Sequence, residues 1–378
     1  MSSEHIGKLM MNRRRLLSLT AAGVTISSLG LPNVRQAYAA ELVRWVSPRG
    51  TIEVLDDYPY WVGKKFGYFG DIETTLEPGP SDATATVKLV DQNQADVGYP
   101  SPGVFSLALA QGIPLVSVFH MGGSDVFDFA FRKGEAPQDL KALEGKTVVL
   151  GSAGWQSIAD PMLKAAGVDI TKVKYVDAGW PTWGTALAQG KGDSALTWEG
   201  LRAQWKGQGL DFDYILGRNF SKLPANSFVI RRADFEDPAK KELYGRYFQG
   251  WAAGLEFGKH NPRAATQIVM EQFPGLSSQM TPAVATESMM QLANVFAGRM
   301  DERKKWGFHL MESWQLFFNI GREIGQITGD FKVEDVVKND LVDPANSFDA
   351  AKVKADADGF QLSEDYKTVD VEAIKAAL

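Results

Sequence analysis

The residues best suited to chemistry in this sequence are large aromatic rings and a few polar side chains in predicted loops. Rigid rings with a small number of converging polar atoms are typical of a cleft that binds a small molecule. We therefore predict a ligand cleft and assign to it Arg49, Asp57, Tyr60, Tyr99, Ser101, Asp125, Ser152, Trp155, Trp180, Trp198 and Glu199.

The position of each ring in the predicted elements separates cleft residues from core residues. Tyr99, Trp155 and Trp198 stand at turns where a helix begins, which favours the cleft, whereas Trp61 and Trp183 stand within helical patterns, which favours the core. Glu199 follows Trp198 at a predicted helix start. It either stabilises the helix dipole or accepts an N–H from a ligand held against Trp198, and both interpretations stay open.

The sequence lacks the residue combinations on which common enzymes depend. It contains no cysteine, and none of its four histidines has a partner at metal-ligand spacing. Residues 151–154 read GSAG, which does not match the G-x-S-x-G nucleophile elbow. We therefore predict a protein that is not an enzyme and that uses no cofactor and no metal. A secreted enzyme working through the carboxylates of Asp57, Asp125 and Glu199 remains the alternative.

Among the predicted elements that position these residues, one unit occurs twice in the sequence. Asp96 to Gln111-Gly112 and Asp193 to Gln208-Gly209 both read as a strand, a turn, a helix and a Gln-Gly stop, at a constant offset of 97 residues. At this offset Ser101 falls opposite Trp198. Ser101 can cap a helix whose first residue is Pro102. The repeat predicts two similar α/β lobes, each presenting its turn at the carboxyl end of a parallel sheet, where such sheets bind ligands.

The pattern changes along the chain from α/β to helical. Up to about residue 230, short apolar runs alternate with helical patterns, and the following stretches carry apolar residues at helical spacing throughout. We predict helices over 238–259, 262–272, 282–298 and 304–327. The residues after Gly329 are charged and weakly periodic, which predicts short surface helices or a frayed tail.

The first 39 residues have the composition of an export signal. Arg13-Arg14-Arg15 is followed by a modest apolar stretch over 16–31 and by Ala37-Tyr38-Ala39, which predicts cleavage before Ala40. The arginine run favours the twin-arginine route, with general secretion as the alternative. The formal net charge is −6, and removal of the signal leaves about −10, which argues against nucleic acid or an anionic membrane as partner.

Several short motifs, in this order, resemble one group of exported binding proteins. They are GYF at 67–69, QADVG at 94–98, AQGIP at 110–114, LEGKTV at 143–148 and AQGKGD at 188–193. With the export signal, the chain is similar to the periplasmic solute-binding proteins of ABC importers for nitrate, sulfonates, taurine and thiamine-pyrimidine precursors. The resemblance implies an α/β, two-lobed periplasmic-binding-protein (Venus-flytrap) fold, type II-like, with a helical C-terminal part. It also implies a periplasmic location, a small-molecule ligand in the cleft, and an ABC permease of the inner membrane as partner; we expect a monomer.

The expected domain organisation follows from the same resemblance. Residues 40–125 and 226–340 would form lobe 1, residues 126–225 lobe 2, and residues 341–378 a tail that packs on lobe 1 or is partly disordered. The family's ligand loops would correspond to 47–57, 99–101, 151–155 and 198–199. A ligand-sensing domain that docks on a membrane receptor is an alternative to the transport role.

The predicted ligand loops depart from those of simple anion binders of the group. They are rich in aromatic rings and carboxylates, and Arg49 is their only obvious cation. We therefore expect a small organic ligand with an aromatic or heterocyclic ring, for example a pyrimidine-like one. A sulfonate, taurine or nitrate-type anion is the alternative. Relatives that act as enzymes use a cysteine-rich stretch, which this chain lacks.

Overall fold

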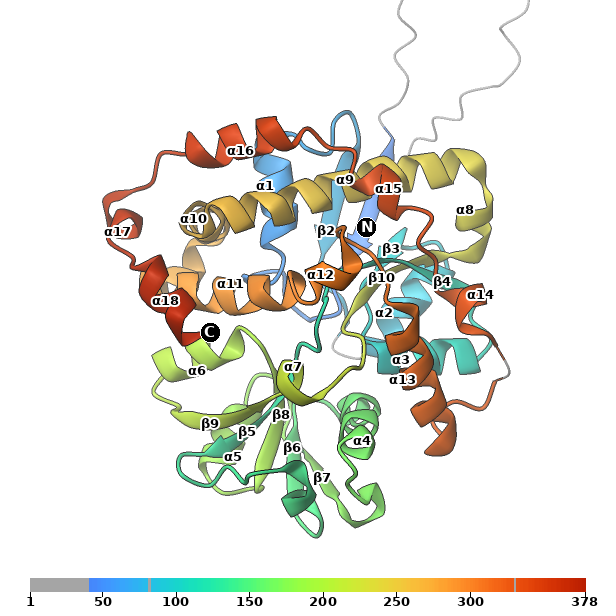
Figure 1. The fold of residues 1–378 in the computed structure, drawn as a ribbon, viewed down its shortest axis with the longest axis vertical. Helices are drawn as coiled ribbons and strands as arrows, with labels where there is room; N and C mark the ends of the chain where they lie inside the picture. The colour runs from blue at the N-terminus through green and yellow to red at the C-terminus, as the bar shows by residue number, and fades with distance from the viewer. Residues whose placement is uncertain (1–40, 81–82, 330) are drawn as a thin grey trace, which may run out of the picture. The chain divides into compact units, whose positions relative to one another are not determined.

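Two five-stranded mixed sheets organise the computed structural model, which describes residues 41–80, 83–329 and 331–378. The predicted export signal over 1–39 lies outside these described residues. In Figure 1 one sheet lies in the lower part of the drawing with its own helices, and the long helices of the C-terminal half surround the other sheet. All of these elements belong to one compact unit of the chain.

The first sheet, sheet A, has the strand order β2-β1-β3-β10-β4. Its strands are β1 (Leu42–Val46), β2 (Glu73–Glu77), β3 (Val97–Gly98), β4 (Leu115–His120) and β10 (Ser227–Arg231). The first three are parallel, and β10 runs antiparallel to both of its neighbours. Every residue of β4 is buried, as expected for a strand covered on both faces.

The second sheet, sheet B, repeats this order with later strands as β7-β6-β8-β5-β9. Its strands are β5 (Phe127–Arg132), β6 (Thr147–Leu150), β7 (Lys174–Asp177), β8 (Ser194–Trp198) and β9 (Phe212–Leu216). Here β5 takes the place of β10 as the antiparallel strand beside the third parallel one. The equal order of strands agrees with the internal repeat in the sequence, which places β3 and β8 at the same position of their sheets.

The paired aspartates of the repeat make the same backbone contacts. Asp96 accepts a hydrogen bond from the backbone N–H of Arg44 at 2.8 Å, and Asp193 accepts one from that of Thr147 at 2.9 Å. Each aspartate also donates its own N–H to the carbonyl of the same partner residue. Each carboxylate therefore fastens the start of the third strand to the first strand of its sheet.

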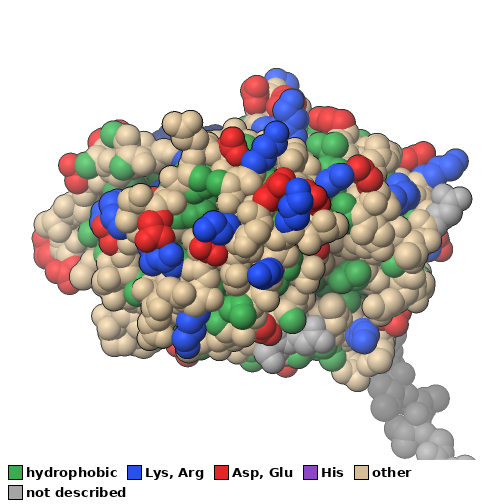
Figure 2. Space-filling view, turned by 90° about the horizontal axis from the view of Figure 1, so that it is seen from below, with side chains coloured by type: hydrophobic (Ala, Val, Ile, Leu, Met, Phe, Trp, Pro, Cys, Tyr) green, Lys and Arg blue, Asp and Glu red, His purple; other side chains and the backbone are tan. Residues whose placement is uncertain are grey.

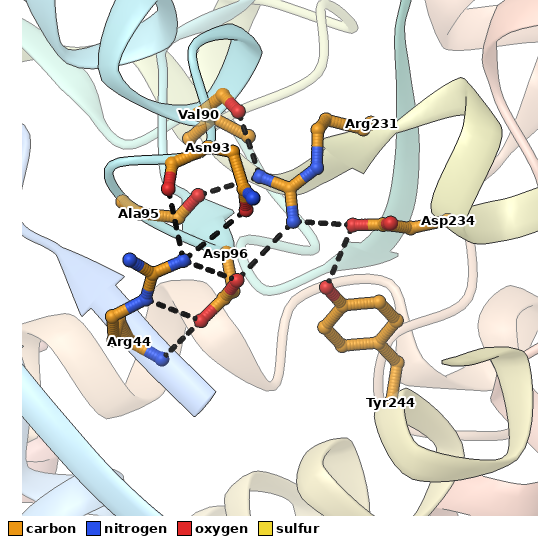
Figure 3. Close-up of polar contacts among 8 residues, drawn as sticks. All are labelled: Arg44, Val90, Asn93, Ala95, Asp96, Arg231, Asp234 and Tyr244. Carbon is orange, nitrogen blue, oxygen red and sulfur yellow. Dashed lines mark hydrogen bonds and ion pairs between the residues drawn. The ribbon is translucent and has the colours of Figure 1, made fainter. Parts of the chain in front are cut away.

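In sheet A this contact is extended into a charged network, which Figure 3 shows. The Asp96 carboxylate lies between Arg44 at 2.9 Å and Arg231 of β10 at 3.2 Å. Arg231 also pairs with Asp234, which accepts a hydrogen bond from the Tyr244 hydroxyl at 3.0 Å. Burial acts to raise the pKa of Asp96, but the bonds from Arg44 and the contact with Arg231 lower it below the ordinary value.

The helices of the two repeated units end alike but begin differently. Helix α3 (Pro102–Ala110) begins directly after its capping residue Ser101, whose hydroxyl accepts from Val104 N–H at 3.3 Å. Helix α6 (Leu201–Gly207) begins only after Gly200, at φ +93°. Because β8 extends to Trp198, the second unit has a longer strand where the first has a helix start. Trp198 is therefore the last residue of a strand, and the predicted helix start at Trp198-Glu199 is wrong.

The remaining helices up to β10 connect the strands of the sheets. They are α1 (Tyr58–Phe66), α2 (Ala83–Asp91), η1 (Leu140–Leu143), η2 (Ala153–Trp155), α4 (Gln156–Ala165), η3 (Ile170–Lys172), α5 (Trp183–Ala188) and α7 (Gly217–Phe220).

Beyond β10 the chain is helical, as predicted. The main helices are α8 (Arg232–Glu236), α9 (Pro238–His260), α10 (Pro262–Gln272), η4 (Pro274–Ser278), α11 (Pro282–Phe296), α12 (Met300–Arg303) and α13 (Met311–Glu323). The prediction of one helix over 304–327 is wrong. Gly307 has φ +82° and forms a bridge with His120 of β4, so this stretch leaves the helical path before α13 begins.

The residues after 330 form short helices that cover the helical part. They are α14 (Val333–Val336), α15 (Val342–Ala345), α16 (Ala350–Asp358), α17 (Glu364–Lys367) and α18 (Val371–Ala377). Helices α15 and α16 pack on α9, and Leu341, Val353 and Tyr366 are buried in the core around it. Among the described residues, we find no helix with the length and apolarity needed to cross a membrane.

Candidate functional site

A cavity of about 460 Å³ lies where loops from the two sheets face each other. Its wall is built from residues that follow the carboxyl ends of β1, β3, β6 and β7, together with the end of β8. This is the edge at which open α/β sheets bind ligands. The volume lies within the range of sites for small organic molecules. The lining residues come from both sheets and from α11.

The cavity brings most of the predicted ligand residues together. Those that line it are Arg49, Tyr99, Ser101, Ser152, Trp155, Trp180 and Trp198. The other four predicted residues, Asp57, Tyr60, Asp125 and Glu199, are not part of its wall. Lining residues that the sequence did not single out include Asp56, Asp177, Asn226, Leu292 and Phe296.

Arg49 is the cation of the cavity, and its charge is already matched by two carboxylates. Its Nη2 lies 2.5 and 2.6 Å from the two carboxylate oxygens of Asp57, and its Nη1 lies 3.6 Å from Asp56. Burial alone would lower the pKa of Arg49, but the charges of Asp57 and Asp56 raise it, so it stays protonated. A bound anion would therefore compete with Asp57 for the same guanidinium.

The two carboxylates beside Arg49 differ in where they point. Burial raises the pKa of Asp57 to about 6 despite its contact with Arg49, and Asp57 is 1% exposed behind the cavity wall. Asp56 lines the cavity, and burial raises its pKa as well. Asp56 also accepts a hydrogen bond from the Trp198 side chain, and thereby joins the loop after β1 to the end of β8.

Four tryptophans form one cluster beside the cavity. The rings of Trp180 and Trp198 are stacked at 5.4 Å and 11°, and Trp183 stacks on both of them. The Trp155 ring stands nearly perpendicular to that of Trp198, at 82° and 5.7 Å between centroids. Trp155, Trp180 and Trp198 line the cavity, whereas Trp183 is buried below them and donates to the Leu196 carbonyl. Trp180 is 40% exposed, so part of this aromatic surface faces solvent.

Two hydroxyls in the wall differ in what they can offer a ligand. Ser101 is committed to capping α3, with Pro102 at the first position as the sequence predicted. The Ser152 side chain makes no hydrogen bond among the described residues, and the neighbouring Ala153 N–H donates to Asp177 at 3.0 Å. Ser152 is therefore the hydroxyl that remains free for a ligand.

Glu199 lies under the cavity rather than in its wall. It is fully buried, and its carboxylate lies 2.8 Å from Arg202 and 3.1 Å from Arg218. Asp128, on the neighbouring strand β5, is close enough for the charge of Glu199 to add to burial in raising its pKa. Two carboxyls and two guanidinium groups thus meet in one internal cluster, and Glu199 does not line the cavity.

Tyr60 and Asp125 have structural partners as well. The Tyr60 hydroxyl accepts a hydrogen bond from Thr74 at 3.0 Å, and its ring packs on Trp45 in the core of the sheet A half. Asp125 accepts from the Ser221 hydroxyl at 2.6 Å and from Phe127 N–H at 3.1 Å. Tyr60 thus joins α1 to β2, Asp125 joins the residues before β5 to those after α7, and neither residue lines the cavity.

One buried arrangement has the residue types of a catalytic triad without access to substrate. The His309 ring nitrogens lie 2.8 Å from the Ser117 hydroxyl, 3.0 Å from that of Ser227 and 2.9 Å from the Asn339 oxygen. Burial lowers the pKa of His309 to about 3, so the ring is neutral. Ser117, Ser227 and His309 are at most 2% exposed and none lines the cavity. The described residues also contain no group of His, Asp and Glu placed to hold a metal ion.

Solved structures of low sequence identity share this fold. The alkanesulfonate-binding protein SsuA from Xanthomonas axonopodis pv. citri, solved with MOPS, has a TM-score of 0.60 at 12% identity, over 80% of this chain and 100% of its own. The periplasmic nitrate-binding protein NrtA from Synechocystis PCC 6803 has 0.58 at 14% identity, over 89% and 97%. The periplasmic aliphatic sulphonate-binding protein SsuA from Escherichia coli has 0.51 at 15% identity, over 80% and 93%.

These likenesses confirm the predicted fold class, which is the two-lobed α/β fold of periplasmic binding proteins. No curated protein matches the sequence. The pattern of the family described as NMT1/THI5 like matches residues 56–265, which is more than half of the chain. The resemblance noted in the sequence is thereby confirmed, and the chain belongs to the NMT1/THI5-like family.

Proposed function

We propose that this protein is an exported solute-binding protein that captures a small organic molecule in the cavity and delivers it to an ABC importer. The observation that carries the proposal is the cavity itself, which both sheets line at the carboxyl ends of their strands. Family membership and the fold support the same role. An export signal at residues 1–39 and a periplasmic location belong to this proposal.

The composition of the wall favours an organic ligand over an inorganic anion. Three indoles and Tyr99 supply apolar surface that nitrate could not use, whereas a ligand with a carbon skeleton could cover it. Arg49, the one Lys or Arg among the described residues of the wall, is already paired with Asp57 and Asp56. An anion would have to compete with the carboxylate of Asp57, which contacts Arg49 through both of its oxygens.

A sulfonate or related anion is the second candidate, and one arrangement favours it. The cavity wall includes the beginning of α3 at Ser101, the free hydroxyl of Ser152 and Arg49. Helix starts and guanidinium groups bind anions in many proteins. The two proteins named SsuA are described as binding proteins for sulfonates, and the one named NrtA as a nitrate-binding protein. An enzyme has less support, because Asp57, Asp125 and Glu199 lie outside the wall.

A thermal-shift screen of the mature chain, beginning at Ala40, tests the proposal. A ligand that binds only the folded protein raises the melting temperature by mass action. The panel should contain organic cations, neutral heterocycles, amino-pyrimidines, alkanesulfonates, taurine and nitrate, and each hit should be recovered chemically unchanged. If no compound in a panel of several hundred metabolites shifts the melting temperature, or if hits are consumed, the role in solute capture is contradicted.

A further inference from the structure

We infer that the ligand carries a positively charged nitrogen, which lies in the corner formed by the indoles of Trp155, Trp180 and Trp198 and is neutralised by the carboxylate of Asp56. This inference rests on the proposed function and specifies the chemical class of the ligand. It depends on the geometry of the rings and on the charges of the groups that face the cavity.

The ring geometry does not suit a flat ligand clamped between two indoles. Two rings that hold a third between them need about 7 Å between their planes, twice the contact distance of aromatic carbons. Trp180 and Trp198 are 5.4 Å apart between centroids and nearly parallel, so they already contact each other. The Trp155 ring meets this stack at 82° to Trp198 and 72° to Trp180. The three rings therefore form two walls of a corner.

A corner of aromatic rings is suited to a rounded cation. The faces of indole rings carry negative electrostatic potential, and tryptophan is the strongest of the side chains that attract cations in this way. An alkylated ammonium group can contact two walls at once, whereas a flat neutral ring can stack on only one of them. The aromatic surface here thus favours a tetrahedral, positively charged group.

The charges around the cavity point in the same direction. Arg49 is balanced by Asp57 at 2.5 Å, and Asp56 then remains as an additional carboxylate in the wall beside Trp198. Asp177, the last residue of β7, adds a second carboxylate at the rim. None of the carboxyls and guanidinium groups of the Glu199 cluster lines the cavity, and the charged residues of the wall are Arg49, Asp56 and Asp177. A cationic ligand would supply the charge that the cavity lacks.

Choline and 3,3-dimethyl-1-butanol form a matched pair of probes, since the second has a carbon in place of the charged nitrogen. Calorimetry on the mature chain at pH 8 should show choline binding at least tenfold more tightly than its neutral isostere. Asp56→Asn should weaken choline binding about tenfold and leave the isostere unchanged. Trp155→Leu, which keeps an apolar side chain without the ring, should reduce the preference for choline. Asp211→Asn, the same charge change at an exposed surface pair, is the control.

The outcomes separate this inference from the proposed function. Equal affinity for the two probes overturns the inference of a cationic ligand and leaves solute capture in place. The same holds if taurine, nitrate or an alkanesulfonate binds tightly while choline and tetramethylammonium show no binding at millimolar concentration. The inference is also overturned if neither choline nor tetramethylammonium binds while neutral heterocycles do. Failure of the entire metabolite screen contradicts the proposed function as well.

Discussion

Neighbouring residues in this site have different roles because their surroundings differ. Asp56 and Asp57 are adjacent in the chain, yet Asp57 is bound to Arg49 by both oxygens, whereas Asp56 faces the cavity. Trp198 and Glu199 are also adjacent, but Trp198 ends β8 and lines the cavity, whereas Glu199 lies in the turn that follows and is fully buried outside the wall. Position in the chain alone therefore does not identify a ligand contact.

Asp125 should make the stability of the protein depend on pH. Burial raises its pKa to about 7, so between about pH 4 and pH 7 the folded protein holds a proton that the unfolded chain has released. The folded state then binds more protons than the unfolded state, and the free energy of unfolding falls as the pH rises through this window. One carboxyl contributes a slope of at most about 1.4 kcal/mol per pH unit. Asp125→Asn should remove that slope in urea denaturation between pH 4 and pH 8.

Asp57, with a pKa of about 6, and Asp128, with a raised pKa, add slopes of the same sign in the wild type. The measured quantity is therefore the difference between the Asp125→Asn variant and the wild type. Asp211→Asn, at the exposed pair with Lys133, serves as the control for loss of one carboxylate. A variant whose stability varies with pH as steeply as that of the wild type would show that Asp125 is ionised throughout.

The sequence allowed local features of the site to be predicted better than its long-range contacts. Ser101 and Pro102 are a capping residue and a first helical residue by their chemistry alone, and they take these positions. The partner of Glu199 could have been suspected from Arg202, three residues later, but Arg218 comes from another helix. Leu292 and Phe296 could not have been identified, because a helical apolar pattern does not reveal which of its residues borders a cavity.

At the scale of elements, Asp96 and Asp193 make the same backbone contact at the start of β3 and of β8, but they differ in burial. The Asp96 side chain is 9% exposed and lies between two guanidinium groups, while Asp193 is 39% exposed. Asp96→Ala removes the only carboxylate that pairs with Arg44 among the described residues and one of the two that pair with Arg231, which should cost about 3 kcal/mol of unfolding free energy. Asp193→Ala loses mainly one hydrogen bond from Thr147 N–H, which should cost about 1 kcal/mol.

Urea denaturation of both variants at pH 7 measures the two losses. Asp96→Asn is the matched control, because it keeps an oxygen for the N–H of Arg44 and removes only the charge, and its loss should fall between the other two. Equal losses at Asp96 and Asp193 would mean that the network of Arg44, Arg231 and Asp234 adds nothing beyond the shared backbone contact.

The helices and strands could be predicted where the apolar residues of a segment follow one regular spacing. They could not be predicted where a segment pairs with a distant part of the chain. Helix α10 spans the predicted residues, since Pro262 begins it and its apolar spacing is regular. The stretch over 304–310 looked helical, yet Gly307 bridges to His120 of β4 and lies against the Phe119 ring. Strand β9 carries no strong alternation and was not predicted, and it is one of the two edge strands of sheet B.

At the scale of the whole molecule, the two sheets are joined by helix contacts as well as by the cavity wall. Helix α3 of the sheet A half packs on α4 of the sheet B half, and α6 packs on α11. Gln326 donates hydrogen bonds to the Ser106 hydroxyl of α3 and the Ser157 carbonyl of α4, both at 3.2 Å. On the face drawn in Figure 2, acidic and basic side chains are intermixed, so this face presents no field of one sign to a charged polymer.

The close approach of α3 and α4 at Gly103 tests whether the two halves move as a hinge. A Cβ at Gly103 would lie 2.4 Å from the Ser157 carbonyl oxygen and 2.6 Å from its hydroxyl, so Gly103→Ala cannot fit this arrangement. If the halves hinge, as in many binding proteins, the variant relieves the clash by opening. We then expect a larger radius of gyration in small-angle scattering, ligand affinity about tenfold weaker, and stability near that of the wild type, because only the population of the binding-competent arrangement changes.

A rigid molecule would respond to the same substitution in a different way. It would have to absorb the clash within packed helices, at about 1–3 kcal/mol of unfolding free energy, with an unchanged radius of gyration. Gly275→Ala is the control, since the added Cβ would meet only the Glu53 side chain at an ordinary 3.5 Å. Saturating ligand adds a second comparison, because it should return Gly103→Ala toward the wild-type radius only if the open and closed arrangements exchange. Unchanged scattering together with lost stability would exclude the hinge and leave a preformed pocket.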